Sequence, residues 1–304
     1  MREIGVADAR RYFAAQAVAG VAWWAAVAAS PAVRDATLGD LPPAWLAGPD
    51  LVLFAGGSAL ATWRRSTTWG WITLAWTTVV TVGLWGYALV TGEAGWGALA
   101  MAAALVFSTA AALTLARGRL PIHWITSGLL SFRSAPERSP ASHLRHSLAQ
   151  LIVFWTAFFV VVPLVLTAVE RRLGLRWSAL DHRVVAGAGV GLLVVFSGVG
   201  LWSCAAMSLR GEGTPLPSAM ARRLVVVGPY RYVRNPMAVA GAAQTIGVGL
   251  IARSWLVVVI AVAGAVAWDV LIRPQEEQDM AERFGVDFER YRAATRCWLP
   301  TRPT

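Results

Sequence analysis

Two stretches near the carboxyl end of the chain combine residue types that can bind a charged organic ligand. The first runs from Gly228 to Met237 (Gly-Pro-Tyr-Arg-Tyr-Val-Arg-Asn-Pro-Met), and the second from Arg273 to Glu277 (Arg-Pro-Gln-Glu-Glu). Arginine can bind a carboxylate through two parallel hydrogen bonds, and glutamate can accept hydrogen bonds from an ammonium group or from ribose hydroxyls. A carboxylate near a sulfonium is also electrostatically favourable. These residue types predict a site for a zwitterionic, nucleotide-like ligand.

The same residues allow a purely structural interpretation. The two stretches bracket a predicted helical hairpin, so that Arg231, Arg234 and Asn235 should come near Glu276 and Glu277. Arg234 could then simply pair with one of the carboxylates and tie two helix ends together. The chemistry of these residues leaves both interpretations open.

Other kinds of site are not indicated. Cys204 and Cys297 match no zinc or redox spacing. His143 and His146 are three residues apart without a third or fourth ligand, so a solvated pair is expected and no metal site is predicted. No Ser-His-Asp or Cys-His set and no paired carboxylates of a hydrolase are found, so the chemistry is not expected to be hydrolytic.

The elements that must position these residues are predicted to be transmembrane helices. Of the 304 residues, 57% are apolar and 14% charged, whereas a soluble domain carries roughly a quarter charged residues. A spanning helix needs about 20 apolar residues. We therefore expect an all-α polytopic membrane protein with about eight transmembrane helices and a short cytoplasmic C-terminal helix. The eight apolar runs are Tyr12–Ala29, Leu51–Trp63, Trp71–Val90, Trp96–Ala116, Leu148–Val169, Val184–Leu209, Met237–Ile251 and Trp255–Ile272.

The chain is expected to divide near residue 146. Residues 117–146 are rich in Arg, Ser and Pro and are typical of a long connection. Residues 1–146 would form a membrane region of four helices with no ionisable residue inside them. Residues 147–304 hold nearly all the motif-like sequence, so the function is expected there.

The positive charge indicates orientation in the plasma (inner) membrane rather than nucleic-acid binding. All 27 basic residues are Arg, and with the amino terminus inside, 21 lie in cytoplasmic segments. This asymmetry follows the positive-inside rule and places both termini and the candidate site at the cytoplasmic face. One segment differs, because residues 170–183 carry four Arg on the predicted outer side; either headgroup binding or an error in the helix count would explain it.

The two stretches together resemble a superfamily of integral membrane methyltransferases, the isoprenylcysteine carboxyl methyltransferases and phospholipid methyltransferases. The shared pattern is Gly-Pro-Tyr-Arg-Tyr-Val-Arg-(His/Asn)-Pro, a two-helix hairpin, Glu-Glu, Phe-Gly, an aromatic residue followed three positions later by Tyr, and a closing Trp-Leu-Pro. Here it covers about residues 211–300, less than a third of the chain. This chain has Ala238 where relatives often have Tyr, and Cys297 where they commonly have Arg.

The resemblance implies S-adenosylmethionine as methyl donor and assigns site residues. In the family a Gly-x-Gly, a Glu-Glu pair and the Arg-His/Asn-Pro turn bind the cofactor, although Gly198 and Gly200 form a rival Gly-x-Gly inside a span. Arg234 is expected to hold an anionic group and Tyr291 to act as a polar contact, and these two are the candidate catalytic residues. The implied cofactor-binding residues are Gly211, Gly213, Tyr230, Arg231, Arg234, Asn235, Pro236, Glu276 and Glu277.

The expected function is methyl transfer from S-adenosylmethionine to a lipidic or small hydrophobic acceptor, with membrane lipids as surroundings. In-line transfer requires mainly proximity and alignment of the reacting atoms. Membrane reductases that bind NADPH have a similar helical arrangement, but they resemble an Arg-His-x-x-Tyr turn that Asn235 and Ala238 do not match. A transporter or scaffold would be expected to have ionisable residues within spans, and only Asp269 approaches that description. The identity of the acceptor and the oligomeric state are not indicated.

Overall fold

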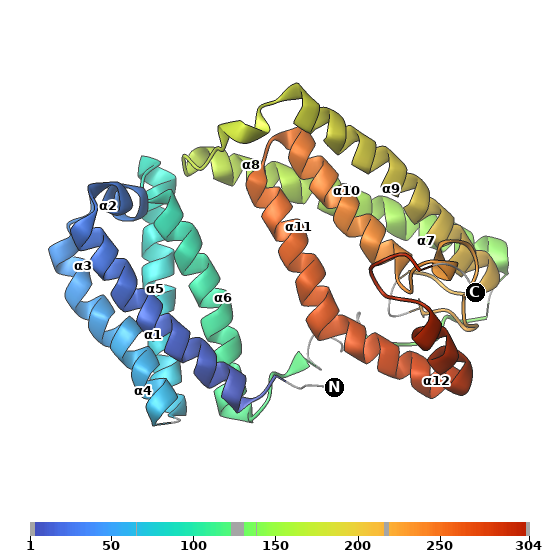
Figure 1. The fold of residues 1–304 in the computed structure, drawn as a ribbon, viewed down its shortest axis with the longest axis horizontal. Helices are drawn as coiled ribbons and strands as arrows, with labels where there is room; N and C mark the ends of the chain where they lie inside the picture. The colour runs from blue at the N-terminus through green and yellow to red at the C-terminus, as the bar shows by residue number, and fades with distance from the viewer. Residues whose placement is uncertain (1–3, 65, 123–130, 138, 216–218, 302–304) are drawn as a thin grey trace. The chain divides into compact units, whose positions relative to one another are not determined.

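The structure consists of helices arranged in two compact units. The computed structural model describes residues 4–64, 66–122, 131–137, 139–215 and 219–301, and no strand of a sheet occurs among them. The first unit comprises Met1–Pro121 with Glu170–Leu175, and the second comprises Ile122–Val169 with Arg176–Thr304 (Figure 1). The expected division of function near residue 146 stays a prediction.

The first unit is a bundle of apolar helices. Its elements are α1 (Val6–Ala29), α2 (Pro31–Leu38), α3 (Pro43–Asp50), the π-helical η1 (Leu51–Gly56), α4 (Gly57–Trp63), α5 (Thr67–Thr91) and α6 (Gly95–Arg117). Four of its stretches are long and apolar enough to cross a membrane, and one of them joins α3, η1 and α4 into a single span of 21 residues.

That second span corrects the sequence-based expectation. The span begins at Pro43 rather than Leu51, and it therefore contains Asp50. The prediction that the first four spans hold no ionisable residue is wrong. Asp50 is tolerated because it is buried within the bundle, where the indole nitrogens of Trp24 and Trp76 each donate a hydrogen bond of 2.8 Å to its carboxylate.

The second unit holds the remaining helices, except that the end of α8, from Glu170 onward, belongs to the first unit. In order, its main elements are α7 (Pro140–Trp155), η4 (Thr156–Val161), α8 (Val162–Arg172), η5 (Ser178–Leu180), α9 (Arg183–Arg210), η7 (Gly228–Arg231), α10 (Pro236–Ala252), α11 (Trp255–Ala267), η8 (Trp268–Ile272) and α12 (Arg273–Ala294). Three of its stretches are long enough to span, and α10, at 17 residues, is shorter. The expected all-α polytopic fold is confirmed, with seven candidate spanning helices among the described residues where about eight were expected. His143 is buried in α7, so the expected solvated histidine pair is wrong.

The last long helix changes character along its length. The helical stretch from α11 to α12 covers 40 residues, well beyond the length of about 20 residues that a membrane span needs. Only the apolar part that ends at Ile272 can therefore cross, and α12 from Arg273 onward is charged. Gly285 interrupts α12 with a φ of +53°, a conformation that favours glycine. Beyond this turn, the Tyr291 hydroxyl donates a hydrogen bond to the carbonyl oxygen of Tyr230, which lies shortly before α10.

Contacts within the protein explain part of the Arg-rich segment of residues 170–183, which begins at the end of α8. The main chain of Leu173 lies so close to Gly95 that a Cβ at residue 95 would be 2.2 Å from the Leu173 carbonyl oxygen. Arg172 donates a hydrogen bond to the carbonyl of Val90. Arg176 pairs instead with Asp181 at 3.3 Å. Two of the four Arg in this segment therefore bind neighbouring protein groups.

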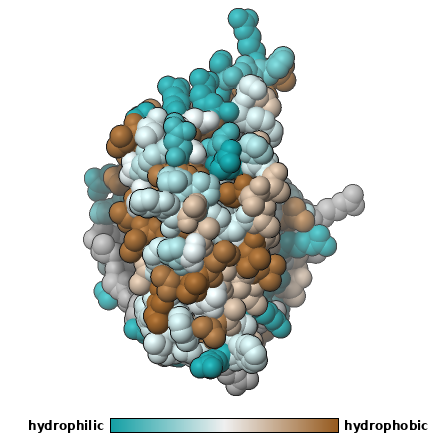
Figure 2. Space-filling model, turned by 90° about the vertical axis from the view of Figure 1, so that its left-hand side faces the viewer, coloured by the Kyte–Doolittle hydropathy of each residue, from teal (hydrophilic) through white to brown (hydrophobic). Residues whose placement is uncertain are grey.

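The surface agrees with a membrane environment. In Figure 2 hydrophobic side chains gather across the middle of the visible face, and hydrophilic ones gather toward its upper part. Exposed apolar residues include Val18, Val52 and Val194, each at least 64% exposed. Such continuous exposure of large apolar side chains is unusual for a soluble protein and is expected for helices that face lipid.

Candidate functional site

One pocket in the second unit brings together half of the ten residues predicted for the site. It lies between the end of α9, the η7 turn, the start of α10 and α12, and its volume is about 80 Å³. Its apolar wall includes Met207, Val225 and Phe284. The predicted site residues that line it are Tyr230, Arg234, Asn235, Glu276 and Tyr291.

The two adjacent glutamates of α12 have different surroundings. Glu277 does not line the pocket; it accepts hydrogen bonds from Arg234 Nη2 at 2.7 Å and Nε at 3.3 Å. Glu276 does line the pocket, and within the described part of the chain it forms no hydrogen bond or ion pair. Consecutive residues of a helix point about 100° apart. The pairing of Glu277 with Arg234 therefore turns Glu276 toward the pocket.

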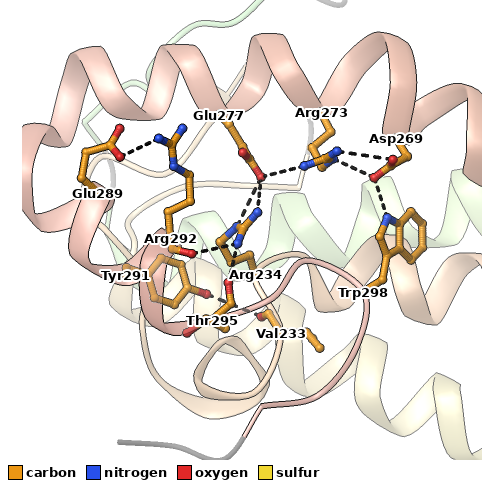
Figure 3. Close-up of polar contacts among 10 residues, drawn as sticks. All are labelled: Val233, Arg234, Asp269, Arg273, Glu277, Glu289, Tyr291, Arg292, Thr295 and Trp298. Carbon is orange, nitrogen blue, oxygen red and sulfur yellow. Dashed lines mark hydrogen bonds and ion pairs between the residues drawn. The ribbon is translucent and has the colours of Figure 1, made fainter. Parts of the chain in front are cut away.

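Arg234 belongs to a polar network that holds the C-terminal segment (Figure 3). Its guanidinium donates to the carbonyl oxygens of Thr295 and of Arg292, the latter at 3.1 Å, in addition to Glu277. Its main-chain nitrogen donates to the carbonyl of Arg296 at 2.9 Å. Most of the N–H groups of Arg234 are thus engaged by protein acceptors, and its guanidinium anchors the end of the chain beside the pocket.

The network continues to the closing Trp-Leu-Pro motif. Arg273 Nη1 lies 3.5 Å from Glu277 Oε1, and Arg273 Nε lies 2.7 Å from Asp269 Oδ1. Trp298 donates its indole N–H to the same Asp269 oxygen at 2.6 Å. Asp269, which the sequence singled out as an ionisable residue near a span end, therefore serves as the link between η8 and the C-terminal segment (Figure 3).

Two tyrosines meet at the pocket. The hydroxyl of Tyr291 donates to the carbonyl oxygen of Tyr230 at 2.6 Å, which fixes α12 against the η7 turn. The hydroxyl of Tyr230 is buried and has no hydrogen-bond partner among the described residues. Burial raises the pKa of both phenols above the ordinary value, so each remains protonated at neutral pH. An unpaired buried hydroxyl costs free energy, and in a pocket it is available to a ligand.

The electrostatics of the pocket centre on Glu276. Burial, together with the neighbouring negative charges of Glu277 and Asp279, raises the pKa of this carboxyl to about 7. A carboxyl in this state takes up or loses its proton near neutral pH. A ligand with positive charge would favour the ionised form.

The two glycines of the predicted Gly-x-Gly act through close packing. A Cβ at residue 213 would lie 2.4 Å from the main-chain nitrogen of Ala221, and one at residue 211 would lie 2.5 Å from Val225 Cγ2. Ala221 and Val225 in turn line the pocket. The lack of a side chain at Gly211 and Gly213 thus allows Ala221 and Val225 to pack closely at the pocket wall. The rival pair differs, because Gly198 is inside α9 and a Cβ there would meet no atom within 4 Å.

The remaining predicted residues shape the turn before α10. Asn235 caps the helix, since its Oδ1 accepts from the main-chain nitrogen of Ala238 at 3.0 Å, and it also lines the pocket. Pro236 occupies the first turn of α10 and is buried. Arg231 is exposed and does not line the pocket.

Sequence reasoning missed several lining residues. Met280, Arg283 and Phe284 follow Glu276 on one face of α12, at spacings of four, seven and eight residues. Arg283 donates to the carbonyl of Ala221 at 2.9 Å and pairs with Asp279 at 2.6 Å. Helical periodicity from Glu276 would have found all three, because residues at these spacings share a helix face.

Comparison with known proteins agrees with the resemblance. Residues 186–287 match the family model for phospholipid methyltransferase. No curated protein and no solved structure matches the chain. The match is consistent with the superfamily of membrane methyltransferases, and it supports methyltransferase activity in general. The matched residues contain most of the pocket, from Met207 to Phe284, and begin well after the first unit.

Proposed function

We propose that the chain transfers a methyl group from S-adenosylmethionine to a lipidic or small hydrophobic acceptor, with the donor bound in the pocket that Glu276 lines. The family match supports the reaction class, and the pocket supports the choice of donor. The excess of Arg in the segments next to the pocket supports a cytoplasmic position for the site.

The observation that carries the proposal is a pair of polar groups that have no protein partner in the part of the chain that the structure describes. Glu276 offers a carboxylate, and Tyr230 has a buried hydroxyl with no partner among the described residues. S-adenosylmethionine has a positive sulfonium and ammonium that suit the carboxylate, and ribose hydroxyls that suit either group. Met207, Val225 and Phe284 supply apolar surface for a base. The residues present therefore fit this donor.

The pocket must widen to admit such a molecule. Its volume of about 80 Å³ is small beside ligand sites of about 300–1,000 Å³. We infer that the walls move apart on binding while the network around Arg234 and Glu277 keeps the start of α10 and the end of α12 joined.

The roles of the residues follow from their surroundings. When bound, S-adenosylmethionine supplies a methyl group on a positive sulfur that is open to in-line displacement. Glu276 would orient the positive end of the donor, and Tyr230 would provide a fixed hydrogen bond. Arg234 would position the pocket through its contacts with Glu277 and Thr295. Tyr291 would hold α12 against Tyr230.

A binding assay tests the proposal and separates it from the reductase alternative. Purified full-length protein in detergent should melt at higher temperature with S-adenosylmethionine or its demethylated product, and NADPH should have no such effect. Stabilisation by NADPH alone would contradict the proposal. Incubation of membranes with isotopically labelled S-adenosylmethionine, followed by mass spectrometry of the lipids, would then identify the acceptor.

A further inference from the structure

A large cavity lies in the first unit, far from the family match in sequence. Its volume is about 730 Å³, and it is lined by residues of α1, α5 and α6 together with the stretch from Leu38 to Phe54. This volume is within the range of about 300–1,000 Å³ that is usual for small-molecule sites. The cavity therefore has room for an organic ligand.

The walls of the cavity are aromatic and apolar. They include Trp23, Trp24, Phe54, Trp76 and Phe107. The helices that form the walls are among those long and apolar enough to cross a membrane. A ligand that reaches this space from the bilayer must itself be largely hydrophobic.

Asp50 places a carboxylate on this wall. The side chain is buried, with 7% of its surface exposed, and it lies within a candidate membrane span. Trp24 donates to one carboxylate oxygen and Trp76 to the other, each at 2.8 Å. A carboxylate offers about four acceptor sites, so these two bonds leave acceptor capacity available.

No positive side chain among the described residues compensates this carboxylate. None of the residues that line the cavity is Arg, and Asp50 forms no ion pair within the described ranges. A buried carboxylate without a cation is costly, and an ionisable residue within a membrane span generally indicates a functional site.

The local backbone is irregular at Asp50. Pro49 lies inside α3, and the π-helical η1 starts directly after Asp50 at Leu51. Such π-helical segments are rare and often occur at functional sites. Asp50 and Phe54, which lies within η1, both line the cavity.

We propose that this cavity binds a hydrophobic organic cation, with Asp50 as the counter-ion and the indole rings of Trp24 and Trp76 beside the positive group. Aromatic faces attract cations, most strongly where water is excluded. The site is separate from the methyltransferase pocket and does not depend on the function proposed for that pocket.

Tetraphenylphosphonium and tetraphenylborate provide a test, because they have nearly the same shape and opposite charge. Binding of each to the purified full-length protein is measured by equilibrium dialysis in detergent. Gly83 lines the cavity, and a Cβ there would meet no atom within 4 Å, so Gly83→Leu should fill the space without a clash. Gly86 is equally unobstructed but does not line the cavity, and Gly86→Leu is the matched control.

Wild-type protein and Gly86→Leu should bind the phosphonium, and Gly83→Leu should lose this binding while it still binds S-adenosylmethionine. Asp50→Asn should weaken phosphonium binding at least tenfold. The borate should not bind in the cavity, so Gly83→Leu should leave any binding of the borate unchanged. Equal binding of the two ions, unchanged binding in Gly83→Leu, or unchanged binding in folded Asp50→Asn would each overturn the proposal. If Asp50→Asn does not fold, the comparison of the two ions in wild type and Gly83→Leu decides the question.

Discussion

Arg234 and Glu277 join the start of α10 to α12 through an ion pair in which Arg234 Nη2 lies 2.7 Å from Glu277 Oε1. The two side chains are 11% and 14% exposed, so the pair is largely shielded from solvent. The residue before Glu277 lines the pocket instead. The Glu-Glu motif thus combines a structural carboxylate with one that is free to meet a ligand.

This difference predicts that substitution of Glu276 affects ligand binding, whereas substitution of Glu277 affects stability. Glu276→Gln should weaken S-adenosylmethionine binding at least tenfold, because a charge-assisted hydrogen bond contributes about 1.5–3 kcal/mol, and it should not lower the melting temperature of the free protein. Glu277→Gln should lower stability by about 1.5–3 kcal/mol, because Arg234 loses its charged partner. Thermal melting and isothermal titration of both variants measure the two effects. Normal binding by folded Glu276→Gln would contradict the proposed role of Glu276.

Binding should depend on pH through Glu276. Its pKa in the folded protein is about 7, so the carboxyl is largely neutral at pH 6 and largely ionised at pH 8. If the ionised form binds the positive donor, affinity should rise about tenfold over this interval. Titrations at several pH values should show this rise in wild type and a flat profile in Glu276→Gln.

In the absence of ligand, the stability of the protein should fall as pH rises. The pKa of Glu276 is raised from an ordinary value of 4.5 to about 7 on folding. The folded state therefore holds this proton more tightly than the unfolded state, and the associated stability is lost as pH rises from about 4.5 to above 7. Melting temperatures without ligand should fall across this range more in wild type than in Glu276→Gln. An equal fall in both proteins would assign the effect to other groups.

The two candidate Gly-x-Gly motifs can be separated by alanine substitutions. Gly213→Ala would place a Cβ 2.4 Å from Ala221 N, so we expect lower stability and weaker donor binding. Gly198→Ala meets no atom within 4 Å and lies inside a helix, where alanine is more favourable than glycine by about 0.5–1 kcal/mol. Melting and binding assays on both variants decide between the motifs, and loss of binding only in Gly198→Ala would favour the rival pair.

A substitution at Gly285 should affect stability through the backbone conformation of this residue rather than through steric crowding. A Cβ there would meet no atom within 4 Å, but the residue has a φ of +53°. Gly285→Ala should therefore reduce stability by about 1–2 kcal/mol. Val286→Ala, at an exposed neighbouring position, serves as the control and should have little effect on thermal melting.

The orientation in the membrane can be tested with introduced cysteines. Ala36 and Ala293 are exposed, the first in the predicted outer region and the second in α12. In intact cells, an impermeant thiol reagent should label Ala36→Cys and should not label Ala293→Cys until the membrane is opened. The parent protein, with Cys204 and Cys297, gives the background signal. The opposite pattern would place the pocket at the outer face.

The sequence alone was sufficient to predict membrane helices and five of the residues that line the pocket. Long apolar runs are a local property, and burial of their backbone in lipid requires helices. The hairpin between Asn235 and Arg273 also follows from chain order, because two successive spans return the chain to the same side. The hairpin therefore predicts that Arg234 and Asn235 lie near Glu276, and the family resemblance adds Tyr230 and Tyr291.

Tertiary structure alone decided which way individual side chains face. The rotation of α12 about its axis follows from the contacts of Glu277 with Arg234 and of Tyr291 with Tyr230, which join residues 43 and 61 positions apart. Periodicity within α12 does not contain that information. Asp50 is a similar case, because its polarity interrupts the apolar pattern of its own helix and is satisfied by Trp24 and Trp76 from other helices. Local composition placed it outside a span, whereas partners distant in sequence make it stable inside one.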